Sequence, residues 1–363
     1  MNPLATMMTL SRIRARAASP SRSALLGGNR RGPGLRTRSL PAHHRTPRPN
    51  LLPRLACVAS ILASVGCKSL VAVESAPAPR APETIPIFSA TGERATLDAV
   101  VDAISDADIV VLGELHGHPT GLGLHAELFR RTLERSSQRS SGPALCLEFL
   151  TRETQHLIDA YLASLIDWPA LEKAYEGIPG SRPGPHRPMI EAAREAGAPV
   201  VAANAPRIYT RAARERGYDK LTTLTLAQRR LFDVPEEMPE GGYRERFFEL
   251  MSPEGDEPAS AAEAASTTAR LESAFRAQCL WDMTMASSVS SVLDRGHRPA
   301  LLVVGSFHCN DDGGTVQMLR RLRPHARILV VTFVDEEAEQ LLEKHRGFAD
   351  YVAYVGQAPS SGS

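Results

Sequence analysis

Six short apolar runs recur along the body of the chain, and stretches with helical periodicity lie between them. The runs are DIVVLGE (108–114), ALCLEF (144–149), APVVAAN (198–204), PALLVVGSFH (299–308), ARILVVTFV (326–334) and YVAYV (351–355). Strands that are apolar throughout, rather than at every second position, are typical of parallel sheets covered by helices on both faces. The pattern therefore predicts an α/β fold in which a central, mostly parallel sheet is flanked by helices.

Helical periodicity is clearest in the intervals 120–138, 152–164 and 187–197. A longer helical interval runs from about Leu221 to Asp294, interrupted by PEEMPEGG and SPEGDEPASAAEAAS. We expect this interval to form a helical insertion or lid on the sheet. The net charge is +1, from 42 basic and 41 acidic residues, so the protein has no strong positive electrostatic field that would attract nucleic acid. We therefore expect no nucleic-acid partner.

The N-terminal part differs in composition from the body. Its first fifty-odd residues are rich in Arg, Pro and Ser, and an apolar stretch from Leu55 to Val65 follows, too short to span a bilayer but typical of a secretory signal. SVGC (64–67) resembles the lipobox of bacterial lipoproteins, although Ser64 stands where leucine is usual. We expect a protein anchored to the cell envelope, on the periplasmic side or outer membrane, through lipidated Cys67. A plainly secreted protein and a cytosolic protein with a spurious extension are the alternatives.

These observations divide the chain into four parts. Residues 1–67 are a basic extension plus signal peptide, and 68–84 are a linker rich in Pro and Ala. Residues 85–357 form a single α/β domain, and 358–363 are a tail with a disordered composition. The body contains three cysteines without paired spacing, so at most one disulfide is expected there and no cysteine zinc site.

Polar side chains stand at the ends of the first four strands of the predicted sheet. The first strand ends in Glu114 and His116, the second in Glu148, the third in Asn204 and the fourth in His308. The carboxyl ends of parallel strands meet at one edge of a sheet, which is where ligands of α/β proteins bind. We therefore expect these five side chains to line one pocket.

The first and fourth strands end in the same local form, GELH (113–116) and GSFH (305–308). Glycine has no β-carbon and lets the backbone turn, which presents the histidine three residues later at the sheet edge. Two histidines and two carboxylates suit a divalent cation such as zinc, manganese or iron. Alternatively, a histidine held by a carboxylate acts as a general base without a metal.

Simpler interpretations exist for several of these residues. Glu114 would stabilise the N-terminus of the following helix without any catalytic role, and Asn204 before a proline is ordinary turn chemistry. His118 and His125 are expected to be surface or helix residues, and Cys309 a small buried hydrophobe. Glu148 follows an apolar run and needs a partner if it is buried, which favours a functional role.

The segment FRAQCLWDMTMASSV (275–289) is expected to be a helix. Gln278 and Asp282 lie along one stripe of it together with Met285 and Val289. Polar groups on an otherwise apolar stripe indicate that this face is directed toward a pocket, whereas a solvated helix face is the alternative.

Taken together, DIVVLGELHGHP, LCLEF, the stretch from Trp168 to Tyr175, VVAANAPR, QCLWDMTMA and LLVVGSFHC resemble the ChaN family of bacterial lipoproteins, which is implicated in haem binding and iron uptake. Its wider superfamily includes the Tiki and TraB proteins and the erythromycin esterases. The resemblance runs from about Ile85 to Val334. It implies a mixed α/β fold with a parallel sheet.

The resemblance also implies two kinds of activity. From ChaN it implies haem held at a homodimer interface with a tyrosine as axial ligand, for which Tyr161 and Tyr175 are candidates, with Asn204, Gln278 and Asp282 as further cofactor contacts. From the Tiki proteins and the esterases it implies hydrolysis of an ester, amide or peptide bond. That reaction would use Glu114, His116, Glu148 and His308, with or without a divalent metal.

Overall fold

The computed structural model describes residues 79–137, 141–252 and 260–358. Their centre is an eight-stranded sheet in the order β2-β1-β8-β7-β3-β6-β4-β5. The strands from β8 to β5 are parallel, whereas β1 runs antiparallel to β2 and β8. The strands are β1 (Ile87–Ser89), β2 (Arg94–Ala95), β3 (Ile109–Glu114), β4 (Ala144–Thr151), β5 (Val200–Asn204), β6 (Ala300–Gly305), β7 (Ile328–Val334) and β8 (Tyr351–Tyr354). The predicted α/β class and mostly parallel sheet are confirmed.

All six apolar runs are strands, and the alternation along β3 shows why they are apolar throughout. Val110 and Leu112 belong to the core on one face of the sheet, and Ile109 and Val111 to the core on the other. Because both faces are covered, every position along such a strand is buried. The short strands β1 and β2 have no comparable apolar run, and the sequence did not reveal them.

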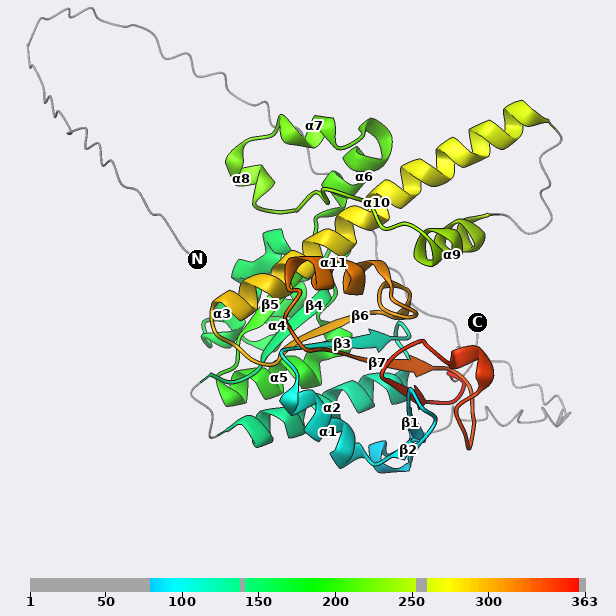
Figure 1. Ribbon diagram of the computed structural model, residues 1–363. Coiled ribbons are helices and arrows are strands. Elements are labelled where there is room, and N and C mark those ends of the chain that lie inside the picture. The colour runs from blue at the N-terminus through cyan, green and yellow to red at the C-terminus, as the bar shows by residue number, and fades with distance from the viewer. Residues whose placement is uncertain (1–78, 138–140, 253–259, 359–363) are drawn as a thin grey trace, which may run out of the picture. The chain divides into compact units, whose positions relative to one another are not determined.

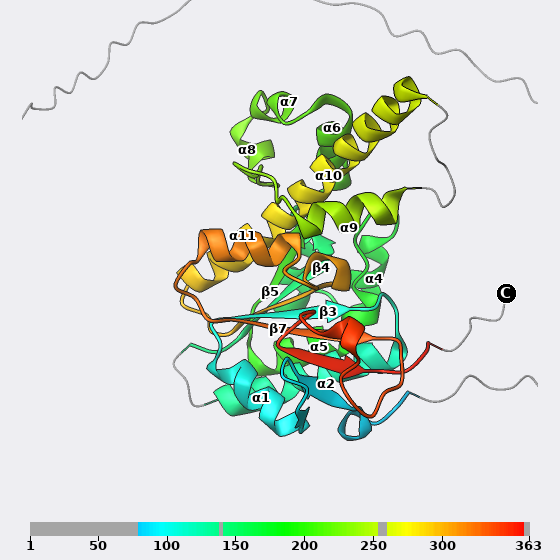
Figure 2. The ribbon, with the colours of Figure 1, turned by 45° about the vertical axis from the view of Figure 1, so that its right-hand side comes forward.

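Helices cover the two faces as separate layers (Figures 1 and 2). One layer consists of α1 (Leu97–Asp106), α2 (Pro119–Ser136), α3 (Gln155–Leu162), α4 (Trp168–Tyr175) and α5 (Arg187–Ala196). The other consists of α9 (Gly242–Met251), α10 (Ala261–Asp294) and α11 (Gly314–Leu322). The intervals predicted as helical at 120–138, 152–164 and 187–197 correspond to α2, α3 and α5.

The predicted helical insertion is present and is organised around α10. The helices α6 (Arg207–Arg216) and α7 (Asp219–Thr222) form a small separate core with Phe232 and with Leu280 of α10. The short helix α8 (Leu226–Arg229) follows them in the chain and has no buried residue. Ser260 precedes the long helix α10, and its side chain accepts a hydrogen bond from the Glu263 amide and so caps the helix. Its C-terminal half supplies the face that packs on the sheet.

The described part of the chain begins a few residues before the predicted domain boundary. Pro82–Thr84 form a 3₁₀ turn, and Arg80 pairs with Glu337 at 3.0 Å, so the last residues of the expected linker lie on the domain. The signal peptide and Cys67 lie outside the described residues. Within the described ranges, no helix is long and apolar enough to cross a membrane. Cys146, Cys279 and Cys309 are each buried and free.

Strand β5 lies at one edge of the sheet, where its outer backbone groups have no neighbouring strand. The side-chain amide of Gln155 forms hydrogen bonds with two of these backbone groups. Its Oε1 accepts from the Ala202 amide at 2.7 Å, and its Nε2 donates to the Val200 carbonyl at 2.9 Å. A primary amide presents the same donor and acceptor pair as a peptide group, so Gln155 replaces part of a missing strand.

Candidate functional site

The polar strand ends converge as the sequence predicts. Glu114, His116, Glu148, Asn204 and His308 all line one pocket with a volume of about 420 Å³. The rings of Phe149, His186 and Trp281, together with Arg182 and Arg207, line the same pocket. We call it the strand-end pocket.

His308 is held from behind by the buried carboxylate of Asp282 on α10. The Nδ1 atom of His308 donates to Oδ1 of Asp282 at 2.6 Å, and Nε2 faces Glu148. Burial alone would lower the pKa of His308, but the charges of Asp282 and Glu148 and the Asp282 hydrogen bond outweigh it and raise the pKa to about 9. The imidazole is therefore positively charged at neutral pH.

Asp282 has a complete set of partners. Besides His308 it accepts from the Tyr243 hydroxyl at 2.7 Å and the Thr315 hydroxyl at 2.6 Å, and Gln278 donates in turn to the Tyr243 hydroxyl at 3.0 Å. The predicted inward stripe of Gln278 and Asp282 is present. These two side chains lie behind His308 and support it rather than forming part of the pocket wall.

Glu148 is placed by an irregularity in β4. The register between β4 and β5 shifts between Leu147 and Thr151, a feature common beside binding sites because it redirects side chains. Oε2 of Glu148 accepts from the Gly305 amide at 2.6 Å, and Oε1 lies 3.7 Å from Nε2 of His308. This half-buried carboxylate therefore has two polar partners.

Glu114 is buried at the centre of a histidine cluster. Its carboxylate accepts from Nε2 of His186 at 2.6 Å and lies 3.5 Å from Nδ1 of His116 and 3.8 Å from Nδ1 of His125. Burial raises its pKa, but hydrogen bonds from His116 and His186 and the nearby histidine charges lower the pKa to about 2. Glu114 therefore does not cap helix α2. That position belongs to His118, whose Nδ1 accepts from the Gly121 amide.

His118 and His125, expected at the surface or in a helix, are both buried, and His118 lies at the N-cap just before α2. His125 is a helix residue, as expected, but it is fully buried and stacks on Phe333 with ring centroids 4.3 Å apart. Burial lowers its pKa to about 4. His186, which the sequence analysis did not select, stacks on Phe149 and lines the pocket. His125 follows the buried Leu124 of α2, whereas His186 lies in a proline-rich loop without a periodic signal.

The glycines of the two GxxH motifs provide space rather than a special backbone conformation, because neither has a positive φ. A β-carbon on Gly113 would lie 2.6 Å from Oγ1 of Thr332 and 2.8 Å from Sγ of Cys309. One on Gly305 would lie 2.8 Å from Cε1 of His116. The expected turning role is therefore corrected: Gly113 permits core packing, and Gly305 makes room for His116.

The two tyrosines expected from the ChaN resemblance lie away from the strand-end pocket. Tyr161 is buried edge-to-face against Trp168 at 5.4 Å, and the hydroxyl of Tyr175 donates to Oγ1 of Thr154 at 3.1 Å. Neither lines the pocket. Both lie on the buried faces of α3 and α4, so their rings serve packing, and this geometry does not offer them to a ligand in the pocket.

Within the described ranges, no three His, Cys, Asp or Glu side chains are grouped so that they would hold a metal ion. The four residues expected to do so form two close pairs instead, Glu114 with His116 and Glu148 with His308.

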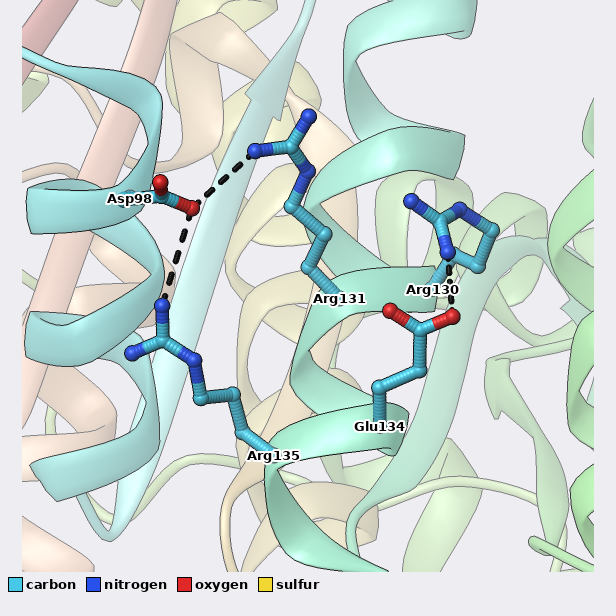
Figure 3. Close-up of a pocket in the computed structure, with 5 residues that line it drawn as sticks. All are labelled: Asp98, Arg130, Arg131, Glu134 and Arg135. Atoms are coloured by element: carbon cyan, nitrogen blue, oxygen red, sulfur yellow. Dashed lines mark hydrogen bonds and ion pairs between the residues drawn. The ribbon is translucent and has the colours of Figure 1, made fainter.

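A second pocket lies between α1 and α2, and the charged side chains that line it pair with one another (Figure 3). Asp98 pairs with Arg131 at 3.0 Å and with Arg135 at 3.6 Å, and Arg130 pairs with Glu134. Exposed pairs of this kind contribute about 0–1 kcal/mol each. All its charges are matched, so it offers a ligand little, and the strand-end pocket remains the candidate site.

Comparison with a solved structure gives the same fold. The structure of ChaN of Campylobacter jejuni, described as showing cofacial haem binding, matches with a TM-score of 0.57 and 16% identity, covering 74% of this chain and 96% of that one. An erythromycin esterase in its open conformation matches with a TM-score of 0.36 and 16% identity, covering 72% and 78%. The type III effector HopBA1 matches with a TM-score of 0.37 and 14% identity, covering 72% and 93%.

No curated protein matches the chain by sequence. The model of one family does match, over residues 100–319, which is more than half of the chain and includes all the strand-end residues described above. The chain belongs to that family, the haem-binding uptake proteins of the Tiki superfamily known as ChaN.

Proposed function

We propose that this protein binds haem, or iron, for uptake at the cell envelope, and that the strand-end pocket holds the ligand. Family membership and the fold shared with the haem-binding Campylobacter jejuni protein support this proposal. The pocket volume of about 420 Å³ lies in the range usual for small-molecule sites. Phe149 and Trp281 give it the aromatic surface that a flat macrocycle needs.

The observation that carries the proposal is the environment of His116. Its side chain is 62% exposed in the pocket, and its Nδ1 lies 3.5 Å from the Glu114 carboxylate. Haem iron is commonly held by one histidine nitrogen, and a carboxylate at the other nitrogen fixes the ring and increases its basicity. His116 is therefore the residue that would bind the iron, in place of the two buried tyrosines.

The proposal extends to location and assembly. The lipobox-like SVGC sequence supports an envelope protein anchored through Cys67. A homodimer would enclose a ligand held at an open pocket, and we propose this assembly for the haem-bound form.

Elemental analysis and an absorbance spectrum test the proposal directly, using residues 68–363 purified without added metal and then given haem. The wild type should show a saturable Soret shift that His116→Ala loses. His325→Ala is the matched control, because His325 is exposed and precedes β7, at the opposite ends of the parallel strands. A wild-type spectrum identical to that of free haem would contradict the proposal.

Hydrolysis is the second candidate, and the Glu148–His308 pair favours it. Nε2 of the charged His308 lies 3.7 Å from Oε1 of Glu148. Such a pair has the acid and the base that hydrolysis of an ester, amide or peptide bond requires. Glu148 would take a proton from water, and His308 would give one to the leaving group.

Activity screens distinguish the two candidates. Turnover of an ester or peptide substrate that falls about a hundredfold or more in Glu148→Gln would support hydrolysis. Near-stoichiometric zinc or manganese, present in wild type and absent from a His116→Ala, His308→Ala double variant, would show that the pocket binds metal despite the paired geometry.

A further inference from the structure

We propose that the rim of the strand-end pocket binds an anionic group of the ligand, a carboxylate or phosphate, through Arg182, Arg207 and Asn204. The inference concerns the pocket of the proposed function and deepens that function by naming a chemical requirement of the ligand. It does not depend on the ligand's being haem.

The side chains of Arg182 and Arg207 are exposed at the pocket, and their charges are unmatched. Among the residues that the structure describes, neither guanidinium has an ion pair or a hydrogen bond, although both line the pocket. The nearby Arg152, by comparison, pairs with Asp233 at 2.7 Å and donates to Ser288. An arginine fork matches the two oxygens of a carboxylate or phosphate, so two unmatched forks at one rim favour an anion.

Arg182 is positioned by a loop that is fastened to the end of β4. The Arg182 amide donates to the Phe149 carbonyl at 2.8 Å. The hydroxyl of Ser181 accepts from the Thr151 amide at 3.1 Å and bonds the Thr151 hydroxyl at 2.8 Å. These bonds hold the backbone of Arg182 at the rim, so less conformational freedom of this loop is lost when a ligand binds.

Arg207 comes from a different segment, the first turn of α6, and reaches the same loop across Gly180. Gly180 has a φ of +86°, and a β-carbon there would lie 3.0 Å from Nε of Arg207. The missing side chain is therefore what permits Arg207 to lie against the loop. Two cationic groups from separate segments are thus brought to one rim.

Asn204 supplies an independent observation. It is 7% exposed and lines the pocket, and its Oδ1 accepts from the Ala205 amide at 2.8 Å, which fixes the orientation of the side-chain amide. In the described ranges, its Nδ2 has no acceptor. Helix α6 begins beside it at Arg207, with Pro206 as a cap residue that has no side-chain hydrogen bond. A free donor on this largely buried side chain, next to a helix N-terminus without a side-chain cap, adds to the attraction for an anion.

The interior of the pocket determines how such a ligand lies. Glu114 and Glu148 also line the pocket, but His116, His186 and His308 pair with them, so the unmatched charges of the pocket are those of Arg182 and Arg207. Phe149 and Trp281 offer apolar surface in the same pocket. The ligand class that fits is therefore an amphiphile with a flat or apolar body and an anionic group held at the rim.

A pair of fluorescent probes tests the inference on residues 68–363. The anionic 8-anilinonaphthalene-1-sulfonate and the neutral N-phenyl-1-naphthylamine share an aromatic body and differ in charge. Wild type should bind the anionic probe about tenfold or more tightly than the neutral one, which is the effect expected of two charge-assisted contacts. Arg182→Gln with Arg207→Gln should abolish that preference.

Two further variants make the test specific. Asn204→Asp keeps the bond to Ala205 and replaces the free donor by a charged oxygen, so it should weaken binding of the anionic probe only. Arg230→Gln with Arg295→Gln removes two positive charges from another pocket and should leave the preference intact. If the Arg182 and Arg207 double variant keeps the preference, or the control variant loses it, the inference is wrong. Competition by dodecanoate and by dodecyl phosphate then identifies whether a carboxylate or a phosphate is preferred.

Anion binding at the rim and haem binding in the pocket can be disproved independently of each other. Haem has two carboxylates, which its dimethyl ester lacks. Equal binding of both porphyrins, together with an unchanged probe preference, would overturn the anion site and leave haem binding in place. Absence of haem binding, with a probe preference that the two arginines control, would overturn haem as the ligand and retain the anion site.

Discussion

The Nδ1 atom of His308 donates a hydrogen bond of 2.6 Å to Oδ1 of Asp282, a carboxylate with no exposed surface. His308 lies in the turn that follows β6, and Asp282 lies in α10. The bond therefore links the sheet to the helix layer that contains α10. It also fixes which nitrogen of His308 faces the pocket. The stability of the fold and the protonation of the site are therefore coupled.

Replacing Asp282 by asparagine should destabilise the protein by about 3 kcal/mol, because His308 would keep a buried charge without its closest partner. The pKa of His308 should also fall, since the charge of Asp282 is the main factor that raises it. Urea unfolding and NMR titration of the His308 ring measure the two effects. Asp106→Asn is the control, because Asp106 is exposed at the end of α1 and should change neither.

Stability should decrease on the alkaline side of neutrality. The folded pKa of His308 is about 9, above the ordinary value of 6.5, so its contribution is complete below pH 6.5 and is lost as the pH rises through about 9. Asp282 and Glu148 face the ring and favour its charge, while His116 opposes it. The urea midpoint of wild type should fall across this interval, and that of His308→Gln should change much less. Parallel curves for the two proteins would contradict the assignment.

A second loss of stability is expected at acidic pH, from a histidine whose pKa is lowered in the folded protein rather than raised. The pKa of the buried His125 is about 4 in the folded protein against 6.5 for an ordinary histidine, so folding disfavours its protonation. Up to about 3 kcal/mol should be lost as the pH falls from 6.5 to 4.

His125→Phe should retain the stack on Phe333 and remove this dependence, as measured by urea unfolding at several pH values. His325→Phe, at an exposed position, should leave it unchanged. The pKa of Glu114 is about 2, so its own contribution is present above pH 4.5 and is lost at lower pH, which separates it from that of His125.

The two GxxH glycines should respond differently to alanine. In Gly305→Ala the new methyl group meets the side chain of His116, which is largely exposed and can move. We expect a stability loss below about 1 kcal/mol and a haem affinity reduced about tenfold by displacement of the imidazole.

In Gly113→Ala the methyl group meets Thr332 and Cys309 in the core, and overpacking there should cost about 1–3 kcal/mol. Urea unfolding and haem titration of both variants test the difference. Equal stability losses would show that the glycines have the same role.

The sequence predicted the parts of the molecule that local patterns determine. The six apolar runs identified the parallel strands, and the order of residues within them placed Glu114, Glu148, Asn204 and His308 at one sheet edge. That inference worked because parallel strands end together whatever their separation along the chain. The stripe through Gln278 and Asp282 was recognisable for a similar reason, since helical spacing fixes which side chains share a face.

Features that depend on tertiary contacts were not accessible in this way. His186 lies in a proline-rich loop with no periodicity, and only the folded chain shows that it donates to Glu114. Tyr161 and Tyr175 were expected at a ligand because of a family resemblance, whereas their helices direct both rings into the core. The unmatched charges of Arg182 and Arg207 likewise become visible only when all nearby carboxylates have been placed.

The amide of Gln155 has a consequence beyond the stability of β5. An open edge of a sheet is a template on which a strand of another molecule can be added, and such addition begins many aggregates. Since Gln155 already occupies the Val200 carbonyl and the Ala202 amide, an incoming strand would have to displace it. Gln155 therefore opposes the addition of a further strand, and so self-association, along the edge strand β5. The other edge strand of the sheet is β2.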